Sequence, residues 1–165
     1  MARRVIRVLG IDPTSRGLCF AVVEGLDRLV AWGCHSISRK TENAIQDRLG
    51  ALLDQYDPDF VAVESPDSQR KGAWALKVLE SIALEALDFG AGVRWVSSHE
   101  IRRVLWLQPG ASRHQVASVL ADRFPELASR LPSRRRPWQS EAHRMNVFDA
   151  TGIAFTAYSL VEGAA

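Results

Sequence analysis

Short apolar runs alternate along the chain with longer segments of helical periodicity. Residues 5–11 and 60–64 are apolar and largely β-branched, which predicts two strands buried at the centre of a sheet. Each of these runs reaches a carboxylate at its C-terminal end, Asp12 after the first and Glu64 in the second. The remaining strands are predicted at 18–24, 28–36 and 93–96.

Apolar residues recur at intervals of three and four in the segments between these runs, as on the buried face of a helix. Ser97 and Ser112 are each followed three residues later by Glu or Gln, the capping-box pattern of a helix start. The predicted helices cover 41–56 and 74–89, begin after Ser97 and after Ser112, and close with a helix from about 141 to 161. The order βββ-α-β-α-β-α-α-α predicts an α/β fold, a five-stranded mixed sheet flanked by helices, in a single domain over residues 1–165.

The composition is that of a globular protein with a core, since 47% of residues are hydrophobic and 24% are charged, which excludes disorder. The net charge is only +2, yet all but three of the 21 basic residues are arginine, which binds phosphate bidentately and is also favoured by GC-rich genomes. No apolar run approaches the roughly 18 residues of a membrane span, and no signal peptide is expected. We therefore predict a cytoplasmic protein in which Cys19 and Cys34 are buried thiols.

Three carboxylates fall where the predicted fold brings them to one place. Asp12 and Glu64 end two strands that a right-handed crossover makes neighbours, and Asp149 lies on the last helix. Converging carboxylates repel one another unless a cation neutralises them, and Mg²⁺ prefers oxygen ligands. Two such ions about 4 Å apart can drive phosphodiester hydrolysis. The alternative is that each carboxylate is a separate solvated side chain, the usual state of Asp and Glu.

Asn146 stands three residues before Asp149, so both side chains project from the same side of the last helix. An amide oxygen can bind a metal ion or hold a water molecule, more weakly than a carboxylate does. The sequence contains no GxxxxGK[ST], GxGxxG or GxSxG motif. A P-loop NTPase, a Rossmann enzyme and a serine hydrolase are therefore disfavoured.

Six short segments stand in a fixed order between residues 5 and 160. They are Val8-Leu9-Gly10-Ile11-Asp12-Pro13, Val61-Ala62-Val63-Glu64, Ala75-Leu76-Lys77, Ser98-His99-Glu100-Ile101-Arg102, Gly110-Ala111-Ser112-Arg113-His114-Gln115-Val116 and Phe148-Asp149-Ala150-Thr151-Gly152-Ile153-Ala154. In this order they resemble the RuvC-type Holliday-junction endonucleases of the RNase H-like superfamily. The resemblance implies an RNase H-like fold and a homodimer that cuts four-way DNA junctions, with a branch-migration helicase as a further partner.

The resemblance also implies roles for individual residues. Asp12, Glu64 and Asp149 correspond to the metal-binding carboxylates, which would hold two Mg²⁺ ions, with Mn²⁺ as a substitute. The fourth catalytic position, Asp or His in the family, is Asn146 here. Arg102 and Arg113 fall where the family has lysines near the scissile DNA backbone. Further DNA contacts are predicted at Arg70, Lys71, Arg134, Arg135 and Arg136.

The chain departs from the family pattern after its second acidic motif, where Asp67 replaces an aromatic residue that resembles a wedge against the bases of the junction. Trp74 or Trp106 could stack on a base in its place, although burial in the core is the commoner state of tryptophan. Two other functions stay open: an RNA-processing nuclease resembling the YqgF group, and a degenerate protein that binds DNA without cutting it, which Asn146 and Asp67 favour. An actin-like ATPase is disfavoured because the chain is too short for a second lobe.

Overall fold

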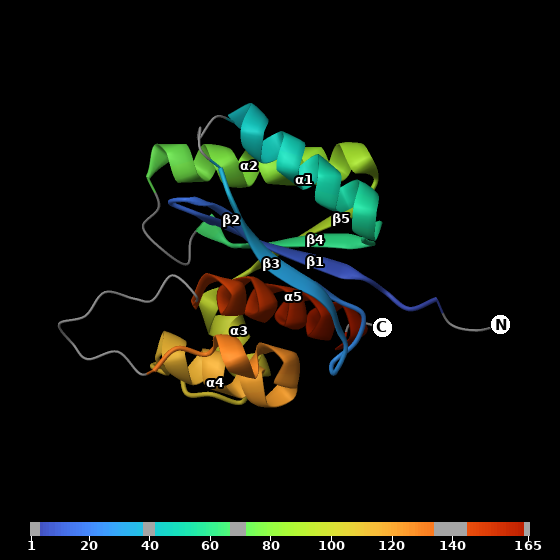
Figure 1. Ribbon diagram of the computed structural model, residues 1–165. Coiled ribbons are helices and arrows are strands. Elements are labelled where there is room, and N and C mark those ends of the chain that lie inside the picture. Colours follow the sequence, from blue (N-terminus) through green and yellow to red (C-terminus); the bar gives the residue numbers. More distant parts are fainter. Residues whose placement is uncertain (1–3, 38–41, 67–71, 134–144, 164–165) are drawn as a thin grey trace.

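A five-stranded sheet lies between two layers of helices in the computed structural model, which describes residues 4–37, 42–66, 72–133 and 145–163 (Figure 1). In chain order the elements are β1 (Val8–Thr14), β2 (Gly17–Val23), β3 (Leu29–Ser36), α1 (Glu42–Tyr56), β4 (Phe60–Glu64), α2 (Ala73–Phe89), β5 (Gly92–Val96), α3 (Ser98–Val104), α4 (Arg113–Arg123), the 3₁₀ helix η2 (Pro125–Arg130) and α5 (Met145–Gly163). The predicted order is confirmed with one addition, η2, which begins at Pro125.

The strands are arranged in the order β3-β2-β1-β4-β5. β1 pairs antiparallel with β2 and parallel with β4, so the sheet is mixed and the predicted adjacency of the first and fourth strands is confirmed. The parallel ladder runs from the Val8–Phe60 pair to the Ile11–Val63 pair. β1 continues to Thr14, three residues beyond the predicted strand end, because its ladder with β2 extends that far.

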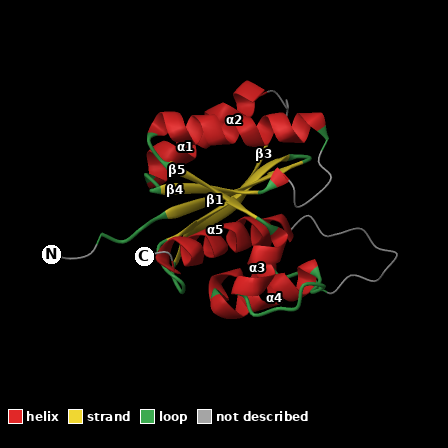
Figure 2. Cartoon of the chain, turned by 180° about the vertical axis from the view of Figure 1, so that it is seen from behind, coloured by secondary structure: helices red, strands yellow, loops and turns green. Residues whose placement is uncertain are grey.

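Each face of the sheet has its own core, as the alternation of side chains along a strand requires. Leu9 and Ile11 pack with Val61 and Val63 beneath α1 and α2. Val8 and Ala62 belong to the other core, which α5 covers directly and α3 and α4 extend (Figure 2). By the same alternation, Asp12 and Glu64 project on the side of the sheet that α5 covers.

Helix α5 lies against β1 at Gly10. A Cβ atom at this position would stand 2.4 Å from the Ala150 carbonyl oxygen and 2.8 Å from the Ala154 Cβ, closer than atoms of this kind approach. Only glycine permits so close a contact between strand and helix backbone. The contact fixes the first turns of α5 beside the strand segment that carries Asp12.

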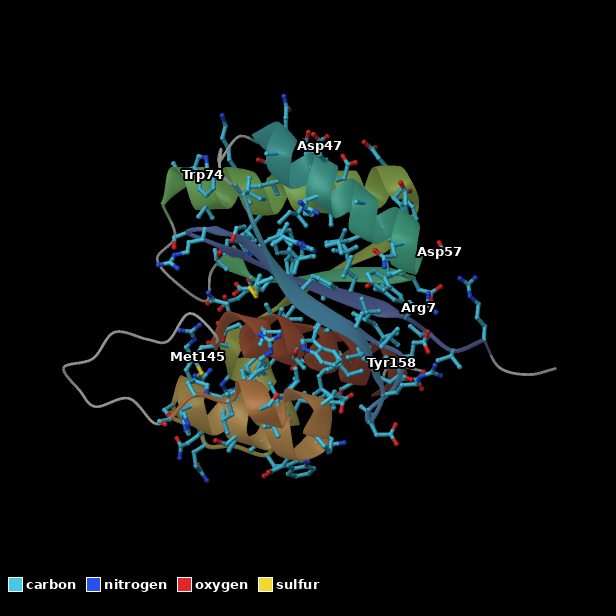
Figure 3. All side chains as sticks on the ribbon, in the orientation of Figure 1. Arg7, Asp47, Asp57, Trp74, Met145 and Tyr158 are labelled. Carbon is cyan, nitrogen blue, oxygen red and sulfur yellow. A yellow bond between two sulfur atoms is a disulfide. The ribbon has the colours of Figure 1, made fainter. Side chains whose placement is uncertain are left out.

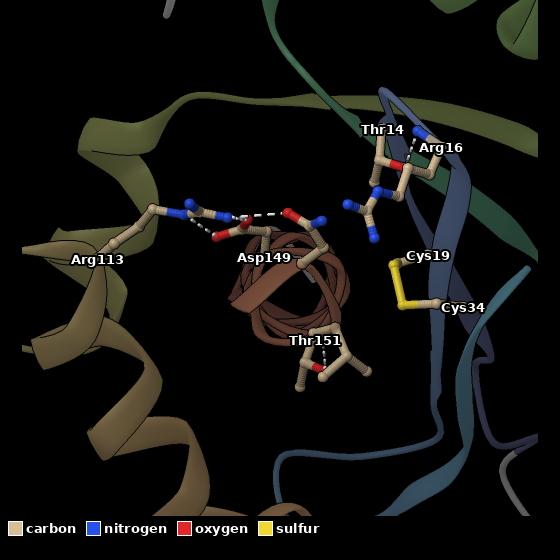
Figure 4. Close-up of a disulfide and its surroundings, with 9 residues drawn as sticks. Thr14, Arg16, Cys19, Cys34, Arg113, Asp149 and Thr151 are labelled. Carbon is tan, nitrogen blue, oxygen red and sulfur yellow. Dashed lines mark hydrogen bonds and ion pairs between the residues drawn. A yellow bond between two sulfur atoms is a disulfide. The ribbon is translucent and has the colours of Figure 1, made fainter. Parts of the chain in front are cut away.

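The two cysteines form a disulfide, so the prediction of two buried thiols is wrong (Figure 4). Cys19 on β2 and Cys34 on β3 stand opposite each other in the antiparallel ladder, with their Cα atoms 4.0 Å apart. Direct opposition in a sheet brings two side chains within bonding reach. Both cysteines were predicted to be buried. Cys19 is buried, but Cys34 is exposed.

Among the described residues, no helix has both the length and the apolar character needed to cross a bilayer.

Candidate active site

The four residues predicted to form a catalytic site line one cavity of about 410 Å³. Asp12 and Glu64 enter it from the sheet, and Asn146 and Asp149 enter it from the first two turns of α5. Arg102 of α3 and Arg113 of α4 also line it, as do the polar residues Thr14 and Ser98. The cavity therefore collects three carboxylates, an amide and two guanidinium groups.

The parallel pairing of β1 with β4 places the two strand carboxylates together. Ile11 and Val63 form the last pair of that ladder, and Asp12 and Glu64 are the next residue on each strand. In a parallel ladder, residues that follow a common pair lie side by side on the same face. The end of the ladder thus presents two carboxylates to the cavity.

Helix α5 supplies its two residues from its N-terminal end. Met145 and Phe148 are buried in the core on the α5 side of the sheet, which fixes the rotation of the helix. Asn146 and Asp149 are three residues apart and so share the side that lines the cavity. Burial of the apolar residues therefore orients the polar ones.

Arg113 binds both side chains from α5. Its Nε donates to Asp149 Oδ1 at 3.1 Å, its Nη2 donates to Asp149 Oδ2, and the same Nη2 donates to Asn146 Oδ1 at 3.0 Å (Figure 4). The capping box at Ser112 fixes the start of α4, so Arg113 projects from a defined first turn. Arg113, a predicted DNA contact, thus forms an ion pair with Asp149, a predicted metal ligand.

Arg102 is held differently, although it lines the same cavity. Its Nε donates to the Ala111 carbonyl at 2.8 Å, and its Nη1 donates to the Ser98 carbonyl at 3.0 Å. The first bond ties α3 to the loop that leads into α4, and the second lies within α3. Their geometry places Arg102 at the cavity wall rather than on the open surface.

The donor set suits a hard divalent cation in its chemistry, because carboxylate oxygens are the preferred ligands of Mg²⁺. Within the described ranges, however, no three His, Cys, Asp or Glu side chains are close enough to share a metal ion. Both carboxylate oxygens of Asp149 accept hydrogen bonds from Arg113, while Asp12 and Glu64 come together from adjacent strands. The two strand carboxylates supply oxygen ligands of the kind that suits a cation.

Five of the predicted DNA contacts, Arg70, Lys71, Arg134, Arg135 and Arg136, lie outside the described residues, as does Asp67.

The expectation that tryptophan is buried is wrong for Trp106, which is 94% exposed. Its backbone has a φ of 59°, a left-handed conformation that costs free energy for a bulky residue. It directly follows buried Leu105 at the end of α3, the helix that carries Arg102. Trp74 is 45% exposed and lies at the start of α2, across the sheet from α5 (Figure 3).

The known proteins that this chain is similar to include RuvC proteins, in agreement with the six sequence segments that resemble that family. No protein-family model matches the chain. A crossover junction endodeoxyribonuclease RuvC of Nitrobacter hamburgensis is 27% identical over 138 residues, which cover 76% of this chain and 81% of that protein. The structure of Thermus thermophilus RuvC in complex with a Holliday junction superposes with a TM-score of 0.69 at 24% identity, over 96% of each chain. Ydc2, the yeast mitochondrial Holliday junction resolvase, superposes with a TM-score of 0.62 at 16% identity, over 93% of this chain and 78% of that one. The RNase H-like fold and the resemblance to RuvC-type resolvases are confirmed.

Proposed function

From its similarity to RuvC-type resolvases along three quarters of its length, we propose that this chain is a metal-dependent endonuclease that resolves four-way DNA junctions. One observation carries the proposal: Asp12, Glu64 and Asp149 line a single cavity together with two arginines. That combination provides oxygen ligands for a cation and guanidinium groups for a phosphate. In this proposal, residues 1–165 form one RNase H-like domain, and the protein acts in the cytoplasm.

Asp12 and Glu64 are the proposed ligands of Mg²⁺ or Mn²⁺. A divalent ion there would supply activation of a water molecule and neutralisation of charge on the scissile phosphate. Arg102, held by two backbone carbonyls at the cavity wall, would contact the DNA backbone. Most of the binding energy would come from such phosphate contacts, which follow the shape of the junction rather than its sequence.

A cleavage assay with three substrates tests this function. The purified chain should cut a four-way DNA junction in Mg²⁺ or Mn²⁺ and leave it intact in excess chelator. Linear duplex of the same sequence and structured RNA should be cut far more slowly. Preferential cutting of RNA would instead favour the YqgF-like alternative, and tight junction binding with no cleavage in either metal would favour the non-catalytic alternative.

A homodimer is part of the proposal, because cutting two strands symmetrically requires two active sites related by a two-fold axis. Helix α2 offers an apolar surface for it: Leu76, Leu84 and Leu87 lie on one side of the helix and are 43%, 59% and 57% exposed. Exposed leucines aligned in this way suit self-association. A branch-migration helicase as a further partner rests on the family resemblance alone.

Leu84→Glu is expected to convert the dimer to a monomer, because it places a charge on this apolar surface. Light scattering coupled to size-exclusion chromatography would measure the mass. Leu26→Glu is the matched control, since Leu26 is 45% exposed in the turn between β2 and β3. The same mass for the wild type and Leu84→Glu would place the dimer contact elsewhere.

Trp106→Ala is expected to weaken junction binding by about tenfold, because stacking of an aromatic side chain on a base contributes about 1–3 kcal/mol. Fluorescence anisotropy of a labelled junction measures the affinity. Trp95→Ala is the control, since it removes the same side chain at a 43% exposed position on β5. Equal affinities for all three proteins would mean that Trp106 does not touch DNA.

A further inference from the structure

The guanidinium of Arg113 occupies the part of the cavity in which Asp149 and Asn146 meet. It bonds both oxygens of Asp149 and the amide oxygen of Asn146, so each of these side chains from α5 faces a positive charge supplied by α4. The ion pair is largely shielded from solvent, with 33% of the Arg113 side chain and 27% of the Asp149 side chain exposed. A bidentate pair in such surroundings is a strong interaction.

We propose that Arg113 serves as a permanent cation of the site and takes the place of one of two divalent ions, so that the chain binds a single ion, on Asp12 and Glu64. This inference rests on the proposed function, since it concerns the metal of the same cavity. It makes Arg113 a positioning residue for Asp149 and Asn146.

The charge of the cavity favours a single ion. Three carboxylates and two guanidinium groups line it, which leaves one net negative charge. One divalent cation already reverses that charge. A second would enter a positive cavity and would also have to displace Arg113 from Asp149.

Asn146 fits the same arrangement. Its amide oxygen accepts a hydrogen bond from Arg113, as a carboxylate would, but it brings no charge to attract another cation. The position that the RuvC-type family usually fills with Asp or His therefore holds the uncharged Asn146 in this protein. Arg113 lies next to it.

Arg103→Gln and Arg113→Gln form a matched pair of variants for a test by metal titration. The full-length protein, stripped of metal, would be titrated with Mn²⁺ alone by calorimetry, and bound Mn²⁺ would be counted independently by electron paramagnetic resonance. The wild type is expected to bind one Mn²⁺, and Arg113→Gln is expected to bind two, because Asp149 becomes available. Arg103→Gln loses the same charge from an exposed residue that does not line the cavity, and should still bind one.

Two Mn²⁺ ions on the wild type, or one on Arg113→Gln, would overturn the inference and leave the proposed function intact. Failure of the wild type to bind any Mn²⁺ would overturn both. Asp149→Asn decides the question if circular dichroism shows that Arg113→Gln does not fold. The Asp149→Asn protein should still bind one Mn²⁺, with an affinity within about tenfold of the wild type, because the substitution removes only one charge near the ion. Loss of that ion would show that Asp149 is a ligand and would overturn the inference.

Discussion

Asp12→Asn should abolish cleavage of four-way junctions while leaving junction binding intact. Asp12 follows the last residue pair of the β1–β4 ladder and lines the cavity with Glu64. Asparagine keeps the shape of the side chain but removes the charge that a divalent cation requires. Loss of the ion's contribution, several kcal/mol of transition-state stabilisation, would slow cleavage about 10³-fold or more. Binding should persist because it depends on phosphate contacts that Asp12 does not make.

The measurement is the rate of strand scission on a labelled junction, together with a gel-shift titration in the presence of a chelator. Asp27→Asn provides the same chemical change in the exposed turn between β2 and β3 and should cleave at the wild-type rate. If Asp12→Asn cuts as fast as Asp27→Asn, Asp12 does not hold the catalytic ion.

Gly10→Ala is expected to destabilise the fold by about 3 kcal/mol or more. Adding atoms to a packed core typically costs about 1–3 kcal/mol, and this methyl group would meet the backbone of α5 rather than a side chain that can turn away. Relief of the overlap requires α5 to move from β1, which also displaces Asp149 from the cavity. Urea denaturation followed by circular dichroism would give the free energy of unfolding, and junction cleavage should fall with it.

Gly50→Ala is the matched control, because a Cβ atom at Gly50 in α1 would meet nothing nearer than Glu85 Oε1 at 3.9 Å. Alanine is the better helix former, so this variant should gain about 0.5–1 kcal/mol. A Gly10→Ala protein within 0.5 kcal/mol of the wild type, a margin typical of exposed sites, would contradict the close contact of α5 with β1.

The fold was predictable where local pattern and topology agree. The apolar run at 60–64 is a strand in the structure, and both capping boxes are formed, because these signals depend on neighbouring residues alone. The meeting of Asp12 with Glu64 followed from the geometry of parallel strands and a crossover through a helix.

Contacts that depend on register or on side-chain conformation were not predictable. The disulfide forms because Cys19 and Cys34 are opposite in the β2–β3 ladder, and composition alone does not fix that register. The ion pair between Arg113 and Asp149 joins residues 36 positions apart in the chain, and its geometry depends on side-chain torsions that no spacing rule specifies. The exposure of Trp106 depends on how the chain turns after α3, against the usual preference of tryptophan.

The pairing of β1 with β4 also governs when the cavity can exist during folding. The two strands are separated in the chain by β2, β3 and α1, and α5 packs on β1 only after all the other elements have been made. Contacts between distant segments form slowly, because the entropy of closing long loops is lost before the contacts stabilise the chain. During synthesis, Asp149 is therefore the last of the three cavity carboxylates to be added to the chain. A copy of the chain that ends before α5 lacks one of the three cavity carboxylates and, on the proposed function, is expected not to cut DNA.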